Sequence, residues 1–255
     1  MRKVLAISLN TFRETVRDKI LYTLLVFAFA MIGSAAILIR ISVRAEVRIL
    51  QDLGLTAISI IGVLMATFLG ITLVYKEVDR RTIFTIISKP VHRYQFVLGK
   101  YLGLLTTLLV SVAAMALGLL LLSRALVSEW TWLLLPAVWL TYVELAVITA
   151  LATLFSSFTT PALSATFTLS LFLIGRLSGD LVAFLAKASS AAVRAFALGT
   201  YYVLPNLHLF NGRGTVALGR FPDPRWVVGA TAYGMLYIAF VLSAAVFIFQ
   251  RRDFK

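Results

Sequence analysis

Few residues of this chain could do chemistry, and one of them lies in an unusual place. Glu144 interrupts an otherwise uncharged stretch, Trp130–Gly175. An unpaired carboxylate is costly in apolar surroundings, so Glu144 should face a cavity, a partner or another polar group. One hypothesis places it on a substrate path or makes it a proton site. The alternative is a structural hydrogen bond to a neighbour such as Tyr142 or to hydroxyls on adjacent helices.

No catalytic constellation accompanies this carboxylate. The 255 residues include no Cys and two His, so cysteine nucleophiles and thiolate metal sites are excluded. Paired carboxylates are missing from the apolar stretches, and no Ser sits in a nucleophile-elbow pattern. We therefore expect no catalytic residues, no metal site and no cofactor bound by this chain, and an intramembrane enzyme is disfavoured.

The composition shows what kind of element must position these residues. Hydrophobic residues make up 60% of the chain and charged residues 14%, whereas soluble domains have roughly half and a quarter. A helix of about 20 apolar residues crosses the hydrocarbon core of a bilayer. The uncharged runs are continuous, which disfavours a β-barrel. They predict an all-α polytopic membrane domain with six spans, at about residues 20–39, 53–75, 101–123, 132–155, 160–180 and 226–250.

The fourth and fifth spans come from one long apolar run. We divide it before Pro161, because hydroxyl residues followed by a proline mark a turn and a helix start. The fifth span reaches full length only by including Arg176 and Asp180. Their i,i+4 spacing allows them to pair or to extend to the membrane surface.

The positive charges predict the orientation. The net charge is +13. Residues 1–19 hold five Lys and Arg, residues 76–100 hold six and the tail holds three, against three in 40–52, one in 124–129 and six in the long loop 176–225. Long loops weigh less in this comparison. Short cytoplasmic loops are enriched in these residues. We expect a multi-pass protein of a prokaryotic cytoplasmic membrane with both termini in the cytoplasm, and no nucleic-acid partner.

Two flanking segments are predicted to lie outside the bilayer core. Residues 1–19 favour a basic amphipathic helix on the membrane surface, and the alternative is a flank that only fixes orientation. Residues 181–225 form an external loop, with a candidate amphipathic helix over Leu181–Leu198 and turns after it. This loop could hold substrate or partner contacts, or act as a lid or connector. Within it, Asn206, His208 and Asn211 do not have a metal-ligand spacing.

The loop 76–100 is too polar to span and too patterned for a slack linker. Charged residues lead into the apolar stretch Ile83–Ile87, and Ser88-Lys89-Pro90 then breaks the chain. A helix, a break and a second helix on the cytoplasmic face would suit docking to a partner. An ordinary charged loop between helices is the alternative.

This loop resembles the one between the second and third spans of ABC-2 class permeases, the membrane subunits of ATP-binding-cassette transporters. The matching residues are Glu77, Arg81-Thr82-Ile83, Ile87-Ser88-Lys89-Pro90-Val91, Arg93 and Gly99-Lys100. Many members have glycine at the position of Arg81. The order of elements is also similar, and the subgroup it resembles most is that of the nitrous-oxide-reductase maturation permease.

The resemblance implies that the loop forms a coupling helix seated in a groove of a separate ATPase subunit. It further implies a permease dimer, with itself or a second permease, that binds two ATPase subunits. The contact residues would then be Glu77, Arg80, Arg81, Thr82, Ile83, Phe84, Ile87, Lys89 and Pro90.

ATP and magnesium would bind to the partner. This chain has no G-x-x-x-x-G-K-[ST] phosphate loop, and Gly99-Lys100 lacks the glycine and strand that should precede it. The resemblance implies ATP-driven export or translocation of a substrate. The rivals are an energy-independent secondary transporter or channel, which would more often show several charged residues mid-membrane, and a membrane scaffold without transport.

Overall fold

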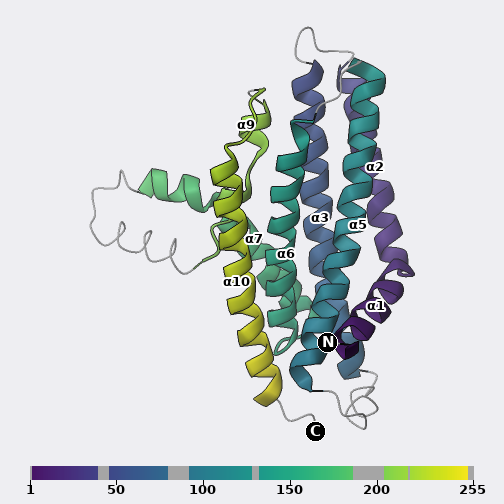
Figure 1. Ribbon diagram of the computed structural model, residues 1–255, viewed down its shortest axis with the longest axis vertical. Coiled ribbons are helices and arrows are strands. Elements are labelled where there is room, and N and C mark those ends of the chain that lie inside the picture. The colour runs from purple at the N-terminus through teal and green to yellow at the C-terminus, as the bar shows by residue number, and fades with distance from the viewer. Residues whose placement is uncertain are drawn as a thin grey trace.

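The computed structural model describes residues 2–39, 46–79, 92–127, 132–185, 204–217 and 219–251. Within these ranges it is helical and contains no strand (Figure 1). The elements are α1 (Arg2–Val16), α2 (Lys19–Ile39), α3 (Glu46–Asp79), α5 (Arg93–Val127), α6 (Leu134–Ser156), α7 (Pro161–Leu185), the 3-10 helix η1 (Leu207–Phe210), α9 (Arg213–Ala217) and α10 (Pro224–Arg251).

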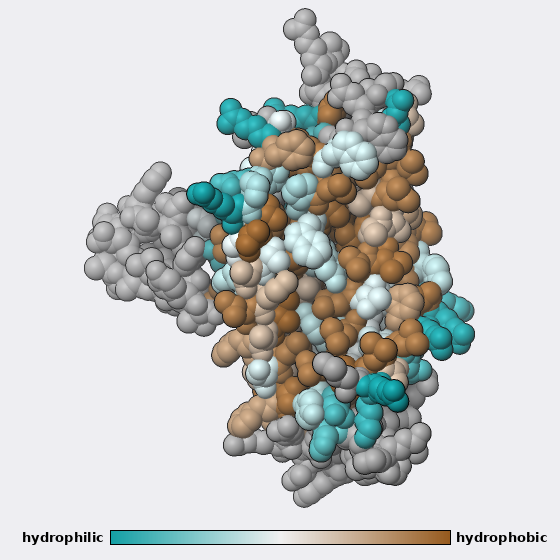
Figure 2. All heavy atoms as spheres, viewed as in Figure 1, coloured by the Kyte–Doolittle hydropathy of each residue, from teal (hydrophilic) through white to brown (hydrophobic). Residues whose placement is uncertain are grey.

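Six of the described helices are long and apolar enough to cross a membrane, namely α2, α3, α5, α6, α7 and α10. The predicted all-α polytopic fold is therefore confirmed. Figure 2 shows a mainly apolar belt over the visible face, with hydrophilic residues gathered toward both ends. This distribution suits a bundle whose middle lies in hydrocarbon.

Two helices extend well beyond the spans that hydropathy indicated. α3 begins at Glu46, inside the predicted loop 40–52, and continues to Asp79, while α5 begins at Arg93. The end of α3 and the start of α5 therefore take up residues at both limits of the predicted loop 76–100. Hydropathy marks where the chain leaves the hydrocarbon, but Lys, Glu and Arg are good helix formers and allow the helix to continue past that point.

The core of the bundle is formed by α3 and α6, which lie side by side. Most of each span is buried, whereas α2, α7 and α10 are largely exposed. The two core helices approach closely at Gly70, where an added Cβ would lie 2.7 Å from the Ala152 Cβ. Small residues permit this close approach between membrane helices.

Aspartates define two helix starts. The Asp18 carboxylate accepts a hydrogen bond from the Ile20 N–H at 3.0 Å, and Asp223 accepts one from the Arg225 N–H at 2.9 Å. These are N-cap contacts, which satisfy backbone donors in the first turn of a helix. Asp18 therefore separates α1 from α2, and Asp223 begins α10, whose first residue is Pro224.

The N-terminal helix α1 packs across the first turns of α5. An added Cβ at Gly103 would lie 2.6 Å from the Ser8 carbonyl oxygen, and one at Gly99 would lie 2.8 Å from Ile7. The predicted helix is therefore present. Leu5 and Leu9 lie exposed on another part of its surface, which favours its predicted position at the membrane surface.

The ends of several helices lie at one end of the bundle. The start of α1, the end of α3, the start of α5 and the end of α10 all lie there (Figure 1). The starts of α3, α6 and α10 lie toward the opposite end. We call these the α1 end and the α9 end of the bundle.

Candidate functional site

The intramembrane carboxylate Glu144 is buried and paired with a cation. It lies on α6, and its Oε1 accepts a hydrogen bond from Nη1 of Arg176 on α7 at 2.5 Å. The exposed fraction of the Glu144 side chain is 1%. A buried carboxylate needs such a partner because desolvation of an uncompensated charge costs several kcal/mol. The other oxygen, Oε2, is buried without a hydrogen-bond partner in the described structure.

The chain between α7 and α10, which we call the connector and which is described over residues 204–217 and 219–223, contacts the Glu144–Arg176 pair. Nη2 of Arg176 also lies 3.5 Å from Oδ1 of Asn211, at the end of η1. Two residues later, Nη1 of Arg213 donates to the Thr56 hydroxyl on α3 at 2.9 Å. The segment 204–217 is therefore fastened to two spans through guanidinium groups.

A second set of contacts centres on Asn206, which is buried. Its Oδ1 accepts a hydrogen bond from the Ser178 hydroxyl at 3.3 Å, and its backbone N–H donates to the Tyr233 hydroxyl at 3.0 Å. The connector can approach α7 this closely because of Gly175, where an added Cβ would lie 2.6 Å from the Pro205 carbonyl oxygen.

These contacts form one arrangement, which we call the polar latch: Thr56, Glu144, Arg176, Ser178, Asn206, Asn211, Arg213 and Tyr233. It joins α3, α6, α7 and α10 to the connector. Burial lowers the pKa of Arg213, with Arg176 acting in the same direction and Glu144 and Asp52 opposing it. A guanidinium keeps its proton in proteins, so Arg213 remains a cation at neutral pH.

The contacts of the polar latch are suited to fixing the connector and the helices to one another, and not to a chemical reaction. It contains a single carboxylate, which already binds an arginine, and no nucleophile beside a general base. No group of three potential metal ligands occurs in the described ranges. The geometry therefore favours the structural hypothesis for Glu144 over a proton site on a substrate path.

The Tyr233 hydroxyl is expected to contribute to holding the connector. Tyr233→Phe leaves the buried Asn206 N–H without its acceptor, so we expect the free energy of unfolding to fall by about 1 kcal/mol. SDS-induced unfolding in mixed micelles, followed by tryptophan fluorescence, measures the change. Tyr237→Phe removes the same atom one turn further along α10 and serves as the control. An equal decrease in the free energy of unfolding in the two variants would show that the hydrogen bond to Asn206 makes no specific contribution to stability.

The structure gives Glu144 a different partner from Tyr142, the neighbour that the sequence suggested. Tyr142 does not bind Glu144 through its hydroxyl, which instead donates to the Leu105 carbonyl at 3.3 Å. The i,i+4 spacing also suggested a pair between Arg176 and Asp180, but the side chain of Asp180 lies outside the described part of the structure. The described partners of Arg176 lie on α6 and in the connector. Both suggestions came from local spacing, and the partners that the structure shows are distant in sequence.

The predicted coupling residues lie almost entirely outside the described ranges. This holds for Arg80, Arg81, Thr82, Ile83, Phe84, Ile87, Lys89 and Pro90. Glu77 lies in the last turns of α3. The two described helices that flank this segment, α3 and α5, have their adjoining ends at the α1 end of the bundle (Figure 1).

One protein-family model matches almost the whole length of the chain. The family model described as ABC-2 family transporter protein matches residues 5–254. No curated protein matches the chain. The matched range includes all six candidate spans, the segment between α3 and α5, and the polar latch.

Proposed function

Because the chain belongs to the ABC-2 family of transporter proteins, we propose that it is the permease of an ATP-driven transporter whose ATP hydrolysis takes place on a separate ABC ATPase subunit. As a family member it is a multi-pass membrane transport permease. The finer assignment is a dimer, with itself or a second permease, carrying two ATPases on the cytoplasmic side of a prokaryotic membrane. It would move its substrate outward or within the bilayer.

One structural observation supports the coupling role: the last residues of the predicted coupling loop and those that follow them, which form the first turns of α5, are packed from several sides. The Phe96 ring stacks on Phe249 of α10 with centroids 6.1 Å apart, and Nζ of the buried Lys100 lies 4.6 Å from the Phe96 centroid. On another side, Gly99 and Gly103 lie against α1. A displacement of the loop would therefore move α1 and α10 together with α5, because tightly packed helices transmit strain.

The charge distribution agrees with an ATPase at the α1 end. Residues 76–100 carry six of the 24 Lys and Arg, and residues 1–19 carry five. The described parts of these two segments lie at or beside the α1 end (Figure 1). Positive charge near spans marks the cytoplasmic side, which is where an ATP-hydrolysing subunit would find its nucleotide.

A secondary transporter is supported less well. Ion-driven transporters use acidic residues that gain and lose protons or bind cations. Glu144, the only acid well inside an apolar run, is paired with Arg176. Breaking this pair in every cycle would expose an uncompensated buried charge.

The coupling assignment is tested by removing the charges at the start of the loop. In the complex formed with a co-expressed ABC ATPase from the same genome, we expect Glu77→Ala with Arg81→Ala to weaken binding at least about tenfold, since few residues carry most of an interface's affinity. Permease-stimulated ATP hydrolysis should fall in parallel. Binding is measured by quantitative co-purification from membranes.

Arg220→Ala is the matched control, because Arg220 is an exposed cation before α10, toward the α9 end of the bundle. It should leave both binding and stimulated hydrolysis unchanged. If the double variant binds the ATPase and stimulates hydrolysis as well as the unmodified chain, residues 76–100 are not the coupling element. Loss of both properties in Arg220→Ala as well would point to general misfolding.

A further inference from the structure

The surface of α1 divides into three sectors around the helix axis, and one of them packs on the bundle. Residues of a helix advance by roughly 100° each, so side chains three or four positions apart lie on the same side. The packed sector includes Ile7, Ser8 and Thr11, which lie against Gly99 and Gly103 of α5. The other two sectors face away from this contact.

The second sector of α1 is apolar and exposed. The exposed fractions of Leu5 and Leu9 are 75% and 50%, and the partly buried Phe12 and Val16 follow on the same side of the helix. These four side chains lie within roughly 60° of one another around the axis. Transfer of such side chains from water into hydrocarbon is favourable, so this sector is suited to the acyl boundary of a bilayer.

The third sector carries positive charge and borders the apolar one. Arg2 and Arg13 are exposed and lie beside Leu9 around the axis, within roughly 40° of it. Arg17, directly after the helix, is also exposed. Glu14, the one acidic residue of α1, lies on the side of the helix opposite Leu5. An apolar strip bordered by cations matches the level at which acyl chains meet anionic headgroups.

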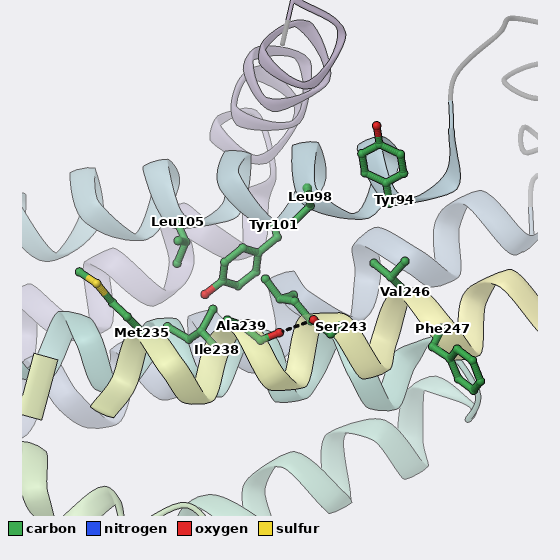
Figure 3. Close-up of a pocket in the computed structure, with 11 residues that line it drawn as sticks. Tyr94, Leu98, Tyr101, Leu105, Met235, Ile238, Ala239, Ser243, Val246 and Phe247 are labelled. Atoms are coloured by element: carbon green, nitrogen blue, oxygen red, sulfur yellow. Dashed lines mark hydrogen bonds between the residues drawn. The ribbon is translucent and has the colours of Figure 1, made fainter. Parts of the chain in front are cut away.

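The connection to α2 holds α1 at this level. Only Arg17 and Asp18 separate the end of α1 from α2, which is a candidate span from Lys19 onward. On α5, Tyr101 and Leu105 point toward α10 (Figure 3), whereas α1 packs on the glycine face of the same helix. Because α1 and α10 lie on different sides of α5, α10 does not cover the exposed leucines of α1.

We propose that α1 docks on anionic phospholipids of the leaflet at the α1 end, with Leu5 and Leu9 among the acyl chains and with Arg2, Arg13 and Arg17 at the headgroup phosphates. A position at the membrane surface requires only the leucines, whereas the cations add a preference for lipids of net negative charge. These lipids would hold α1 in its contact with the first turns of α5. The proposal goes beyond the permease function and does not depend on the ATPase contact.

A single introduced cysteine tests this preference, because the chain contains none. The full chain with Leu5→Cys, labelled with a fluorophore, is placed in vesicles in which either phosphatidylglycerol or phosphatidylcholine carries quenching bromine atoms. Quenching at several mixing ratios gives the binding of the anionic lipid relative to the neutral one. We expect a ratio of at least about five at Leu5→Cys, the factor that one cation near the membrane surface provides.

Leu236→Cys is the matched probe, since Leu236 on α10 has an exposed fraction of 74%, close to that of Leu5. The ratio there should be near one. Replacing Arg2, Arg13 and Arg17 together with glutamine should bring the ratio at Leu5→Cys toward one, while Arg220→Gln, at an exposed cation toward the α9 end, should leave it unchanged.

Salt gives a measurement that needs no charge variant. The ratio at Leu5→Cys should fall between about 0.1 M and 1 M salt, because the screening length shortens from about 10 Å to about 3 Å. A ratio near one at low salt, or a high ratio that neither salt nor the triple variant lowers, would overturn the proposal.

Two other occupants of this surface are distinguished by the same probe, and each would overturn the proposal. If neither lipid quenches the label and Leu5→Cys forms a disulfide between two copies, the surface belongs to a second chain. If neither lipid quenches it and an added ABC ATPase shields it from aqueous quenchers, the surface belongs to that subunit.

Discussion

Replacing Arg176 with methionine is expected to lower the free energy of unfolding by about 3–5 kcal/mol, the range observed when one partner of a buried ion pair is removed. The loss is large because Glu144 would remain as a carboxylate on a fully buried side chain. SDS-induced unfolding in mixed micelles, with tryptophan fluorescence as the signal, measures it. Arg220→Met removes an exposed cation and should cost less than about 0.5 kcal/mol.

The double variant Glu144→Gln with Arg176→Met separates the pair from its parts. It leaves no buried charge on either residue, so it should regain most of the stability that Arg176→Met loses, in the way that replacing both partners of a buried pair is often nearly neutral. If Arg176→Met alone costs less than about 1 kcal/mol, or if adding Glu144→Gln makes the loss greater, the polar latch does not depend on this pair.

Gly103→Ala is expected to destabilise the protein by about 3 kcal/mol, at the upper end of the range for overpacked sites. The added Cβ would lie 2.6 Å from the Ser8 carbonyl oxygen and from the Thr11 Cβ, so α1 would have to move away from α5. If α1 transmits motion from the coupling loop, ATP hydrolysis stimulated by the permease should also fall.

Gly33→Ala is the matched control for this variant. Gly33 also lies within a span, on α2, but an added Cβ there would meet no atom within 4 Å. Because alanine favours a helix over glycine by about 1 kcal/mol, this variant should be neutral or slightly more stable. A loss of stability at Gly33 equal to that at Gly103 would show that the α1 contact is not the cause.

The fold could be predicted from the sequence because membrane spans depend mainly on local composition. In hydrocarbon every backbone polar group must be satisfied within the segment, so an apolar run of sufficient length becomes a helix. The ends of the helices were harder to predict. α3 and α5 continue beyond their apolar parts, to Asp79 and from Arg93, and no hydropathy signal marks where a charged helix stops.

The polar latch could be predicted only in part. The sequence indicated that Glu144 needs a polar partner, and Arg176 was the one cation in the predicted fifth span, which was a usable signal for the pair. The roles of Asn206, Asn211 and Arg213 could not be found in this way. They depend on how the connector returns to the bundle, which is a property of tertiary packing and not of spacing along the chain.

The rate of ATP hydrolysis tests the central claim most directly. The chain and a co-expressed ABC ATPase are purified separately and assayed alone and together in lipid vesicles, with Glu77→Ala and Arg81→Ala as a further sample. We expect no hydrolysis by the chain alone, hydrolysis stimulated by the permease in the complex, and loss of that stimulation in the double variant. Robust hydrolysis by the purified chain without any partner would contradict the proposed division between permease and ATPase.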